Sequence, residues 1–265
     1  MVRAFSTLGC PDADLRTAFA IAERHHLDAI ELRALGDTTN LPAYFASEYG
    51  GPEAFGAAMR SAPVRIAAID TSFHLADAKT SDREQFLAFL PWTEAAGVRW
   101  LRVFDGGTKL SERAAIAAAA EAVLWWREVR ADNGYEADIM VETHHRFLTS
   151  AAIKRFLTAA PETAILWDPH HTWKQGAEDP LTTWRAIGHH VVHIHVNDSL
   201  PVATKTHPYK FVLPGTGEFP MAALRTALAA DNFGGTLSLE WEKLWHPDLP
   251  GIEEALRSAA ERKWW

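Results

Sequence analysis

The chain has 265 residues, 48% of them hydrophobic and 23% charged, which excludes a disordered or fibrous protein and allows one or two domains. Its 26 lysines and arginines against 34 aspartates and glutamates leave a net charge of −8, which disfavours a nucleic-acid binder that relies on phosphate contacts. The single cysteine, Cys10, excludes an intramolecular disulfide and a zinc ribbon, and it fits a reducing compartment. The 13 histidines are the unusual feature of the composition.

Residues 1–16 lack the apolar stretch of a secretory signal, and no segment reaches the ~18 apolar residues of a transmembrane helix. We therefore expect a cytoplasmic protein that contacts neither membrane nor nucleic acid. The 11 tryptophans include the pairs Trp125-Trp126 and Trp264-Trp265. These pairs fit core packing or contacts within a homo-oligomer, a dimer or a tetramer.

Short apolar runs alternate with longer helical patterns along the whole chain. The runs predict strands at residues 2–8, 28–32, 64–72, 98–104, 137–142, 163–168, 191–196 and 236–240. The helical patterns between and after them predict helices at residues 14–25, 52–61, 82–96, 111–132, 149–159, 180–188, 220–230 and 252–263.

Strict alternation of strand and helix implies parallel strand pairing. Repeated over residues 1–265 without a linker, it predicts an α/β fold of one domain, a single (β/α)8 TIM barrel. The main alternative is an open doubly wound sheet. The first predicted strand is followed by Thr7-Leu8-Gly9-Cys10-Pro11 rather than by a G-x-G-x-x-G motif, which weakens that alternative.

The predicted strands end in polar residues, and the carboxyl ends of barrel strands are where catalytic groups gather. Side chains alternate between the two faces of a strand. If the same alternation of inward and outward side chains holds on four consecutive strands, each strand places one potential metal ligand at the mouth of the barrel. On the seventh strand, Val192, Ile194 and Val196 then point outward to the helices. The four ligands are Glu142, Asp168, His195 and Glu240.

Three carboxylates and one imidazole that converge without a partner would repel one another or be costly to bury. A divalent cation resolves this conflict, and an oxygen-rich site with one nitrogen suits Mn²⁺ or Mg²⁺, with Co²⁺ or Zn²⁺ as alternatives. Any one of these residues alone would more often be a helix cap, an ion-pair partner or a hydrogen-bonded core residue. The hypothesis of one metal ion therefore rests on the shared parity of all four.

The motifs resemble those of the xylose isomerase-like barrel superfamily, often labelled sugar phosphate isomerase/epimerase or AP endonuclease family 2. Its members include ketose 3-epimerases, hydroxypyruvate isomerase, inosose dehydratase, 3-dehydroshikimate dehydratase and endonuclease IV. The resemblance covers nearly the whole chain. It is carried by Ile30-Glu31-Leu32-Arg33, Asp168-Pro169-His170-His171, His193-Ile194-His195-Val196-Asn197-Asp198 and Leu237-Ser238-Leu239-Glu240.

The resemblance implies that Glu142, Asp168, His195 and Glu240 bind the metal and that His171 reaches the substrate. It further implies that Glu142 and Glu240 act as acid and base, removing and returning a proton α to a carbonyl through an enediolate that the metal stabilises. Ketose epimerases have an arginine after the metal histidine. Residues 199–210 contain none, and Lys205, His207 or Lys210 are the alternatives there.

Further residues are expected to bind the substrate. They are His74 after the third strand, Arg102 on the fourth, Asp198 after the seventh and Trp173 after the sixth. Arg102 has an alternative role as the ion-pair partner of a carboxylate such as Glu31, and Trp173 has the alternative of core packing. His144 and His145 either line the mouth or are solvated loop residues, and Trp245 is a further aromatic candidate there.

These residues predict a metal-dependent isomerase or epimerase of a small sugar, keto-sugar or polyol-derived carbonyl compound. The main alternative is a dehydratase or lyase on the same fold, of the inosose or dehydroshikimate dehydratase type or cleaving a C-glycoside. An endonuclease IV-like phosphodiesterase is disfavoured by the net charge and by an incomplete set of zinc ligands. A non-catalytic sugar-binding barrel is the remaining alternative, and the intact ligand set speaks against it.

Overall fold

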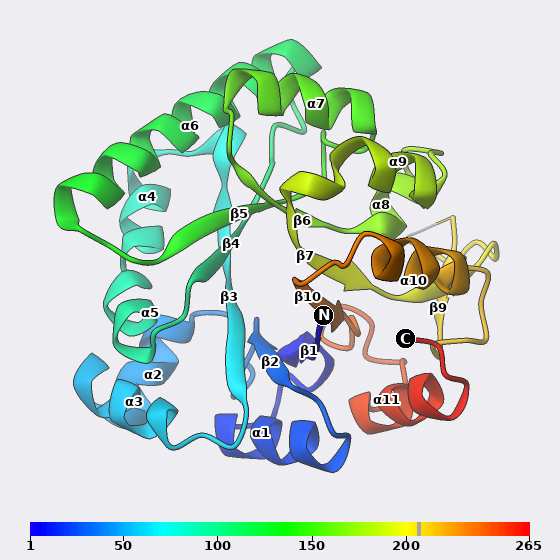
Figure 1. Ribbon diagram of the computed structural model, residues 1–265. Helices are drawn as coiled ribbons and strands as arrows, with labels where there is room; N and C mark the ends of the chain where they lie inside the picture. Colours follow the sequence, from blue (N-terminus) through cyan, green and yellow to red (C-terminus); the bar gives the residue numbers. More distant parts are fainter. Residues whose placement is uncertain (206–207) are drawn as a thin grey trace.

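Eight parallel strands close into a barrel in the computed structural model, which describes residues 1–205 and 208–265 (Figure 1). The barrel confirms the predicted (β/α)8 fold, and every predicted strand is present within a few residues of its expected bounds. Its strands are β1 (Val2–Ser6), β2 (Ala29–Leu32), β3 (Arg65–His74), β4 (Trp100–Phe104), β5 (Asp138–Glu142), β6 (Ala164–Trp167), β7 (Val191–Val196) and β10 (Thr236–Leu239).

The barrel strands neighbour one another in chain order, and β10 closes the ring by pairing with β1. Helices surround this ring as an outer layer (Figure 1). The predicted ones are α1 (Leu15–Arg24), α3 (Pro52–Arg60), α6 (Glu112–Asn133), α7 (Ser150–Ala159), α9 (Pro180–Ile187), α10 (Met221–Ala230) and α11 (Ile252–Glu261).

The helix predicted over residues 82–96 is in fact two helices, α4 (Thr80–Leu87) and α5 (Leu90–Ala96). Pro91 explains the break, because proline lacks a backbone N–H and is tolerated only in the first turn of a helix, where it stands in α5. The longest helix, α6, has clear end signals. The Ser111 hydroxyl accepts the N–H of Ala114 at its start, and Gly134 ends it with a φ of 67°.

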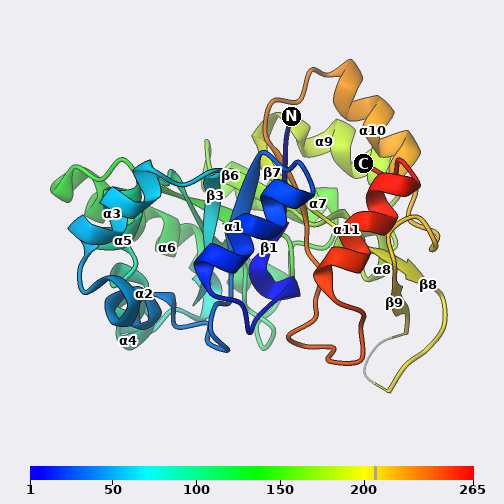
Figure 2. The same ribbon diagram turned by 90° about the horizontal axis from the view of Figure 1, so that it is seen from below.

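Several elements in the loops were not predicted. Helix α2 (Leu41–Tyr49) precedes α3, and the short helix α8 (Pro169–Lys174) begins directly after Asp168. An antiparallel hairpin of β8 (Asp198–Leu200) and β9 (Lys210–Val212) follows β7, on the side of the molecule away from the first residue (Figure 2). His207 lies outside the described residues. Short 3₁₀ turns complete the chain at η1 (Thr7–Gly9), η2 (Leu75–Asp77) and η3 (Gly188–His190).

The apolar core has two parts. The larger one lies between strands and helices, and the smaller one fills the barrel interior with Ala68, Met140 and Leu166. Val192 packs against this inner cluster, so the prediction that it points outward is wrong. The cause is a register shift, because Ile165 pairs with Val191 whereas Leu166 pairs with His193, which leaves Val192 as an extra residue.

No helix in the described part of the chain combines the length and apolarity needed to cross a membrane.

Candidate active site

Four strands bring Glu142, Asp168, His195 and Glu240 together at the carboxyl-terminal mouth of the barrel. Each offers one ligand atom, and these atoms all lie within 4.8 Å of one another. All four residues are buried. Glu142 ends β5, His195 lies near the end of β7, and Asp168 and Glu240 directly follow β6 and β10. The geometry is therefore the one that the shared parity predicts.

The polar atoms of this four-residue cluster are poorly satisfied by the protein itself. Asp168 Oδ2, Glu142 Oε2 and His195 Nδ1 are buried and have no aligned hydrogen-bond partner among residues 1–205 and 208–265. His195 Nδ1 lies 3.1 Å from Glu240 Oε2 and 3.6 Å from Glu142 Oε1. Buried polar atoms normally have partners, so unsatisfied donors and acceptors that converge in this way fit a bound cation.

The pKa values of the side chains in this four-residue cluster reflect the same concentration of charge. Burial raises the pKa of Asp168 to about 6, with Glu240 adding to the effect and His171 opposing it. Burial would lower the pKa of His195, but Glu240 and Glu31 raise it well above its usual value. Burial likewise opposes ionisation of Glu142, yet the Arg102 guanidinium holds the pKa of that carboxyl well below its usual range. Negative charge is therefore concentrated around His195 and Arg102 at the mouth of the barrel.

Glu31, a carboxylate outside the four-residue cluster, orients the His195 imidazole from below. His195 Nε2 donates to Glu31 Oε1 at 2.9 Å, and the Ser238 hydroxyl donates to Glu31 Oε2 at 2.5 Å. His193 Nε2 lies 3.3 Å from the same Glu31 oxygen. With Nε2 engaged by Glu31, His195 presents Nδ1 to the cluster, as metal-binding histidines commonly do.

The cluster opens into a cavity of about 520 Å³, at the end of the barrel where catalytic loops gather. The cavity is lined by Leu8, Arg33, His74, Arg102, Phe104, Glu142, His144, His145, His171, Glu240, Glu242, Trp245 and His246. Three of the expected substrate-binding residues are in this set, namely His74, Arg102 and His171. His144 and His145, whose position the sequence left open, also line it.

Arg102 is fully buried and ion-paired. Its Nη2 lies 3.5 Å from Asp70 Oδ2 and its Nε 3.3 Å from Glu142 Oε2, while its Nη1 donates to the Thr71 carbonyl at 3.0 Å. The guanidinium also stacks over the Phe104 ring, 3.9 Å from its centre. The ion-pair role predicted as an alternative is thus present, although the partners are Asp70 and Glu142 rather than Glu31.

The structure places Asp198 and Trp173 outside the lining of this cavity. The Asp198 carboxylate accepts the backbone N–H groups of residues 199, 215, 217 and 219, which fixes the hairpin that follows β7. Trp173 packs against Phe219 and lies under the Lys174 ammonium. Both side chains therefore have local structural partners.

Histidines form one wall of the cavity. The rings of His144 and His171 lie 4.4 Å apart, and His144 also contacts His145. Burial and the neighbouring His171 lower the pKa of His144 to about 3, and burial and His145 lower the pKa of His74. His74 and His144 are consequently neutral near pH 7. Glu142, His144 and His171 form a further group with ligand atoms within 4.8 Å of one another.

The family model of the xylose isomerase-like TIM barrel matches residues 19–262. The chain belongs to this family. No curated protein matches the sequence.

Solved structures with similar folds include several members of this type of barrel. A crystal structure of the IolI protein with a bound zinc atom has a TM-score of 0.79 at 15% identity, covering 100% of this chain and 99% of that one. The probable 3-DHS dehydratase AsbF from Bacillus anthracis has a TM-score of 0.78 at 15% identity, covering 99% and 98%. A 3-keto-D-glucoside 4-epimerase from E. coli, YcjR, reaches 0.68 at 14% identity, covering 99% of both chains. At such identities the likeness shows the fold alone.

Sequence reasoning missed three charged residues at the mouth of this xylose isomerase-like barrel. Arg33 and Glu242 line the cavity, and Asp70 pairs with Arg102 beneath it. Arg33 and Glu242 stand two residues after Glu31 and Glu240, so extending the alternation of each strand by one step into the loop would have found both. Burial and the charge of Glu240 raise the pKa of Glu242 well above its usual value.

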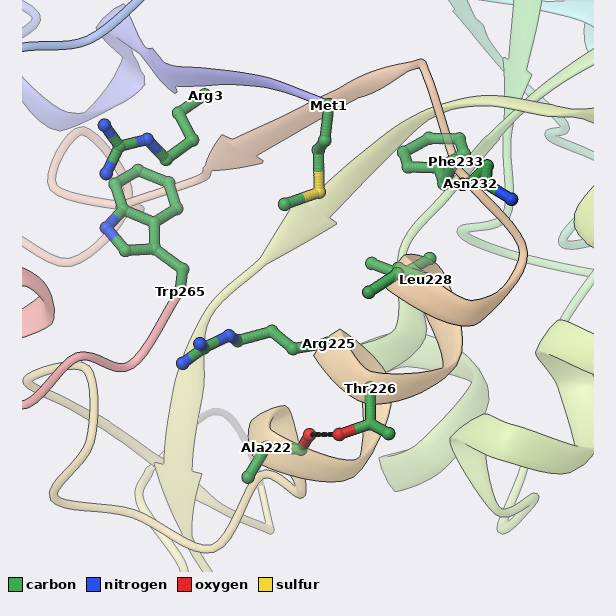
Figure 3. A pocket seen from close by; sticks show the side chains of 10 residues that line it. Met1, Arg3, Ala222, Arg225, Thr226, Leu228, Asn232, Phe233 and Trp265 are labelled. Carbon is green, nitrogen blue, oxygen red and sulfur yellow. Dashed lines mark hydrogen bonds between the residues drawn. The ribbon is translucent and has the colours of Figure 1, made fainter.

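A larger cavity of about 790 Å³ lies away from the cluster, between α10 and the two chain ends (Figure 3). Its lining includes Met1, Leu228, Phe233 and Trp265, and its charged side chains are those of Arg3 and Arg225. No side chain that lines it in the described part of the protein is a carboxylate or an imidazole, so it lacks the acidic and basic side chains that proton transfer to and from carbon requires. The smaller cavity at the mouth is therefore the candidate active site.

Proposed function

We propose that this chain is a cytoplasmic, metal-dependent isomerase or epimerase that acts on a small polyhydroxylated carbonyl compound. The observation that carries the proposal is the buried four-residue cluster, in which Glu142, Asp168, His195 and Glu240 converge under an open cavity. Mn²⁺ is the proposed ion because the donor set has three carboxylates and one imidazole. A divalent ion bound there would polarise the substrate carbonyl as a Lewis acid.

The two glutamates supply the proposed acid and base. β5 and β10, which position Glu142 and Glu240, are separated by β6 and β7 around the ring, so the two carboxylates come from different parts of the barrel wall. Arg102 keeps Glu142 ionised and able to accept a proton from the carbon α to the carbonyl. Glu240 in its protonated form then returns a proton to the same carbon, which yields an epimer, and the proton left on Glu142 is released to water. Return to the neighbouring carbon, with transfer of the hydroxyl proton to the former carbonyl oxygen, yields an isomer instead.

Isotope exchange tests this proposal. The Mn²⁺-loaded protein is incubated in D₂O with a panel of ketoses and keto-polyols, and deuterium at the α-carbon is followed by NMR. We expect incorporation with the wild type and a loss of at least about 100-fold for Glu142→Gln and Glu240→Gln, the usual size of a general acid–base contribution. Glu112→Gln is the matched control, because Glu112 pairs with Arg155 on the surface. Equal exchange in all variants would refute the assignment.

A dehydratase or lyase is the second candidate, and Glu242 favours it. This carboxyl group lines the cavity beside the four-residue cluster without belonging to it. After proton abstraction, a further acid can protonate a departing hydroxyl group, which eliminates water instead of returning the proton. Growth of enone absorbance in the ultraviolet, lost in Glu242→Gln, would support this reaction over isomerisation.

A further inference from the structure

Arg33 is a buried guanidinium whose side chain has no hydrogen bond or ion pair in the described part of the protein, and Asp70, Glu142 and Glu240 attract its charge only at longer range. Its residue is 5% exposed, and its Nη1 atom is buried without a hydrogen bond. No ion pair of its side chain is found among residues 1–205 and 208–265. Arginine is rarely fully buried unless it is paired, because an unpaired buried charge is costly. This cost indicates that a partner is supplied from outside the chain.

Because Arg33 lines the cavity of the candidate active site, a partner of its guanidinium would lie in that cavity. Arg33 directly follows β2 and lines the same cavity as Glu142 and Glu240. Its backbone N–H donates to the Thr7 hydroxyl at 2.9 Å, and the N–H of Ala34 donates to the same oxygen. The loop is therefore anchored, and the guanidinium is held at the cavity by a fixed backbone.

Arg102, the other arginine that lines the cavity, is already ion-paired within the protein. It is paired with Asp70 and Glu142, which leaves Arg33 as the guanidinium available to a ligand. One free guanidinium balances one negative charge, and its planar fork matches a carboxylate.

We propose that Arg33 binds a carboxylate of the substrate, so that the compound turned over at this site is a polyhydroxylated acid rather than a neutral sugar. This inference rests on the proposed function for the reaction, but the binding role of Arg33 can be tested without turnover. In the described lining of the cavity, Arg33 has no second unpaired guanidinium beside it with which to complete a phosphate site. The cavity of about 520 Å³ leaves room for a six-carbon acid.

Titration calorimetry with three matched probes tests the proposal. Sorbitol, gluconate and sorbitol 6-phosphate share a six-carbon chain and differ in the terminal group. The wild type, loaded with Mn²⁺ and again after chelation, should bind gluconate at least about tenfold more tightly than the other two probes, the scale of one charge-assisted pair. Arg33→Met should abolish this preference, and Arg24→Met, on the outer surface, should keep it.

Thermal unfolding separates a binding role from a structural one. Because Arg33→Met removes an unpaired buried charge, the ligand-free variant should unfold at a temperature no lower than the wild type. A structural arginine would instead leave the variant less stable. Unchanged gluconate affinity in Arg33→Met, or a stronger Arg33-dependent affinity for sorbitol 6-phosphate, would overturn the proposal. Since neither readout needs catalysis, isotope exchange can fail while the Arg33 result stands, and the reverse also holds.

Discussion

Glu31 lies beneath the four-residue cluster and accepts hydrogen bonds from both His195 and Ser238. Replacing it by Gln keeps the shape but removes the negative charge that favours His195 as a ligand. We expect Glu31→Gln to weaken Mn²⁺ affinity by about 10- to 100-fold, the usual effect of losing such an outer carboxylate. Competition with a fluorescent chelator measures this affinity. Glu112→Gln serves as the surface control, and an unchanged affinity would show that Glu31 has no such role.

Asp198 has a different part, because its carboxylate accepts backbone N–H groups on both sides of the hairpin. Asp198→Ala leaves these donors without a charged acceptor, so we expect a loss of about 3 kcal/mol in the free energy of unfolding. Urea denaturation measures the loss. Asp132→Ala, at an exposed position, should change the value by less than about 0.5 kcal/mol. A comparable effect of both substitutions would contradict the anchoring role.

The sequence predicted residues that sit on a strand, or one position after it, better than residues further into the loop. Alternation along four strands was enough to bring Glu142, Asp168, His195 and Glu240 to one point, because a strand fixes both parity and height. Asp198 follows its strand, and its partners lie 17 and 19 residues further along the chain at Gly215 and Gly217. Such long-range backbone contacts leave no local pattern in the sequence.

At the scale of elements, α3 and α5 pack so closely that a glycine is required between them. A Cβ atom added at Gly56 would lie 2.2 Å from the carbonyl oxygen of Ala95, which belongs to the backbone and cannot move aside cheaply. We expect Gly56→Ala to destabilise the fold by about 1–3 kcal/mol through overpacking. Differential scanning calorimetry checks this, with Gly234→Ala as the control, because Gly234 has open space around it. Equal melting temperatures would show that the helices can separate freely.

The elements that escaped prediction are short or lie in loops. Helix α8 spans Pro169–Lys174, and its apolar period is too brief to be recognised. It forms because the Asp168 side chain accepts the backbone N–H groups of His170 and His171. A residue predicted to bind a cation thus also begins a helix, and only the structure shows both roles.

At the scale of the whole molecule, the barrel closes around a concentration of buried negative charge. A cation that binds only the folded state stabilises it, by about 2.7 kcal/mol at a concentration of 100 times the dissociation constant. For a protein of this size that corresponds to a rise in melting temperature of about 5 °C. We expect Mn²⁺ to produce this rise in the wild type and to lose it with Asp168→Asn. An equal rise in both proteins would place the bound ion elsewhere.

The closed barrel was predictable because eight strand–helix units of ordinary length have few alternative arrangements. Sequence periodicity could not reveal how charges pair inside it. Arg102 could reach Glu31, Asp70 or Glu142 from mid-barrel, and the choice depends on the stagger between β3, β4 and β5. Pairing across strands is a property of register, which single strands do not encode.

The hairpin after β7 is closed at its base by one side chain, since Asp198 holds residue 199 at one end and residues 215, 217 and 219 at the other. The exposed residues 201–205 within it can therefore change in length and composition during evolution without moving the strand that carries His195, whereas Tyr209 and Phe211 are buried against His170 and belong to the core. Replacing residues 201–205 with a loop from another barrel is accordingly a route to a different surface beside the candidate active site that leaves the scaffold intact.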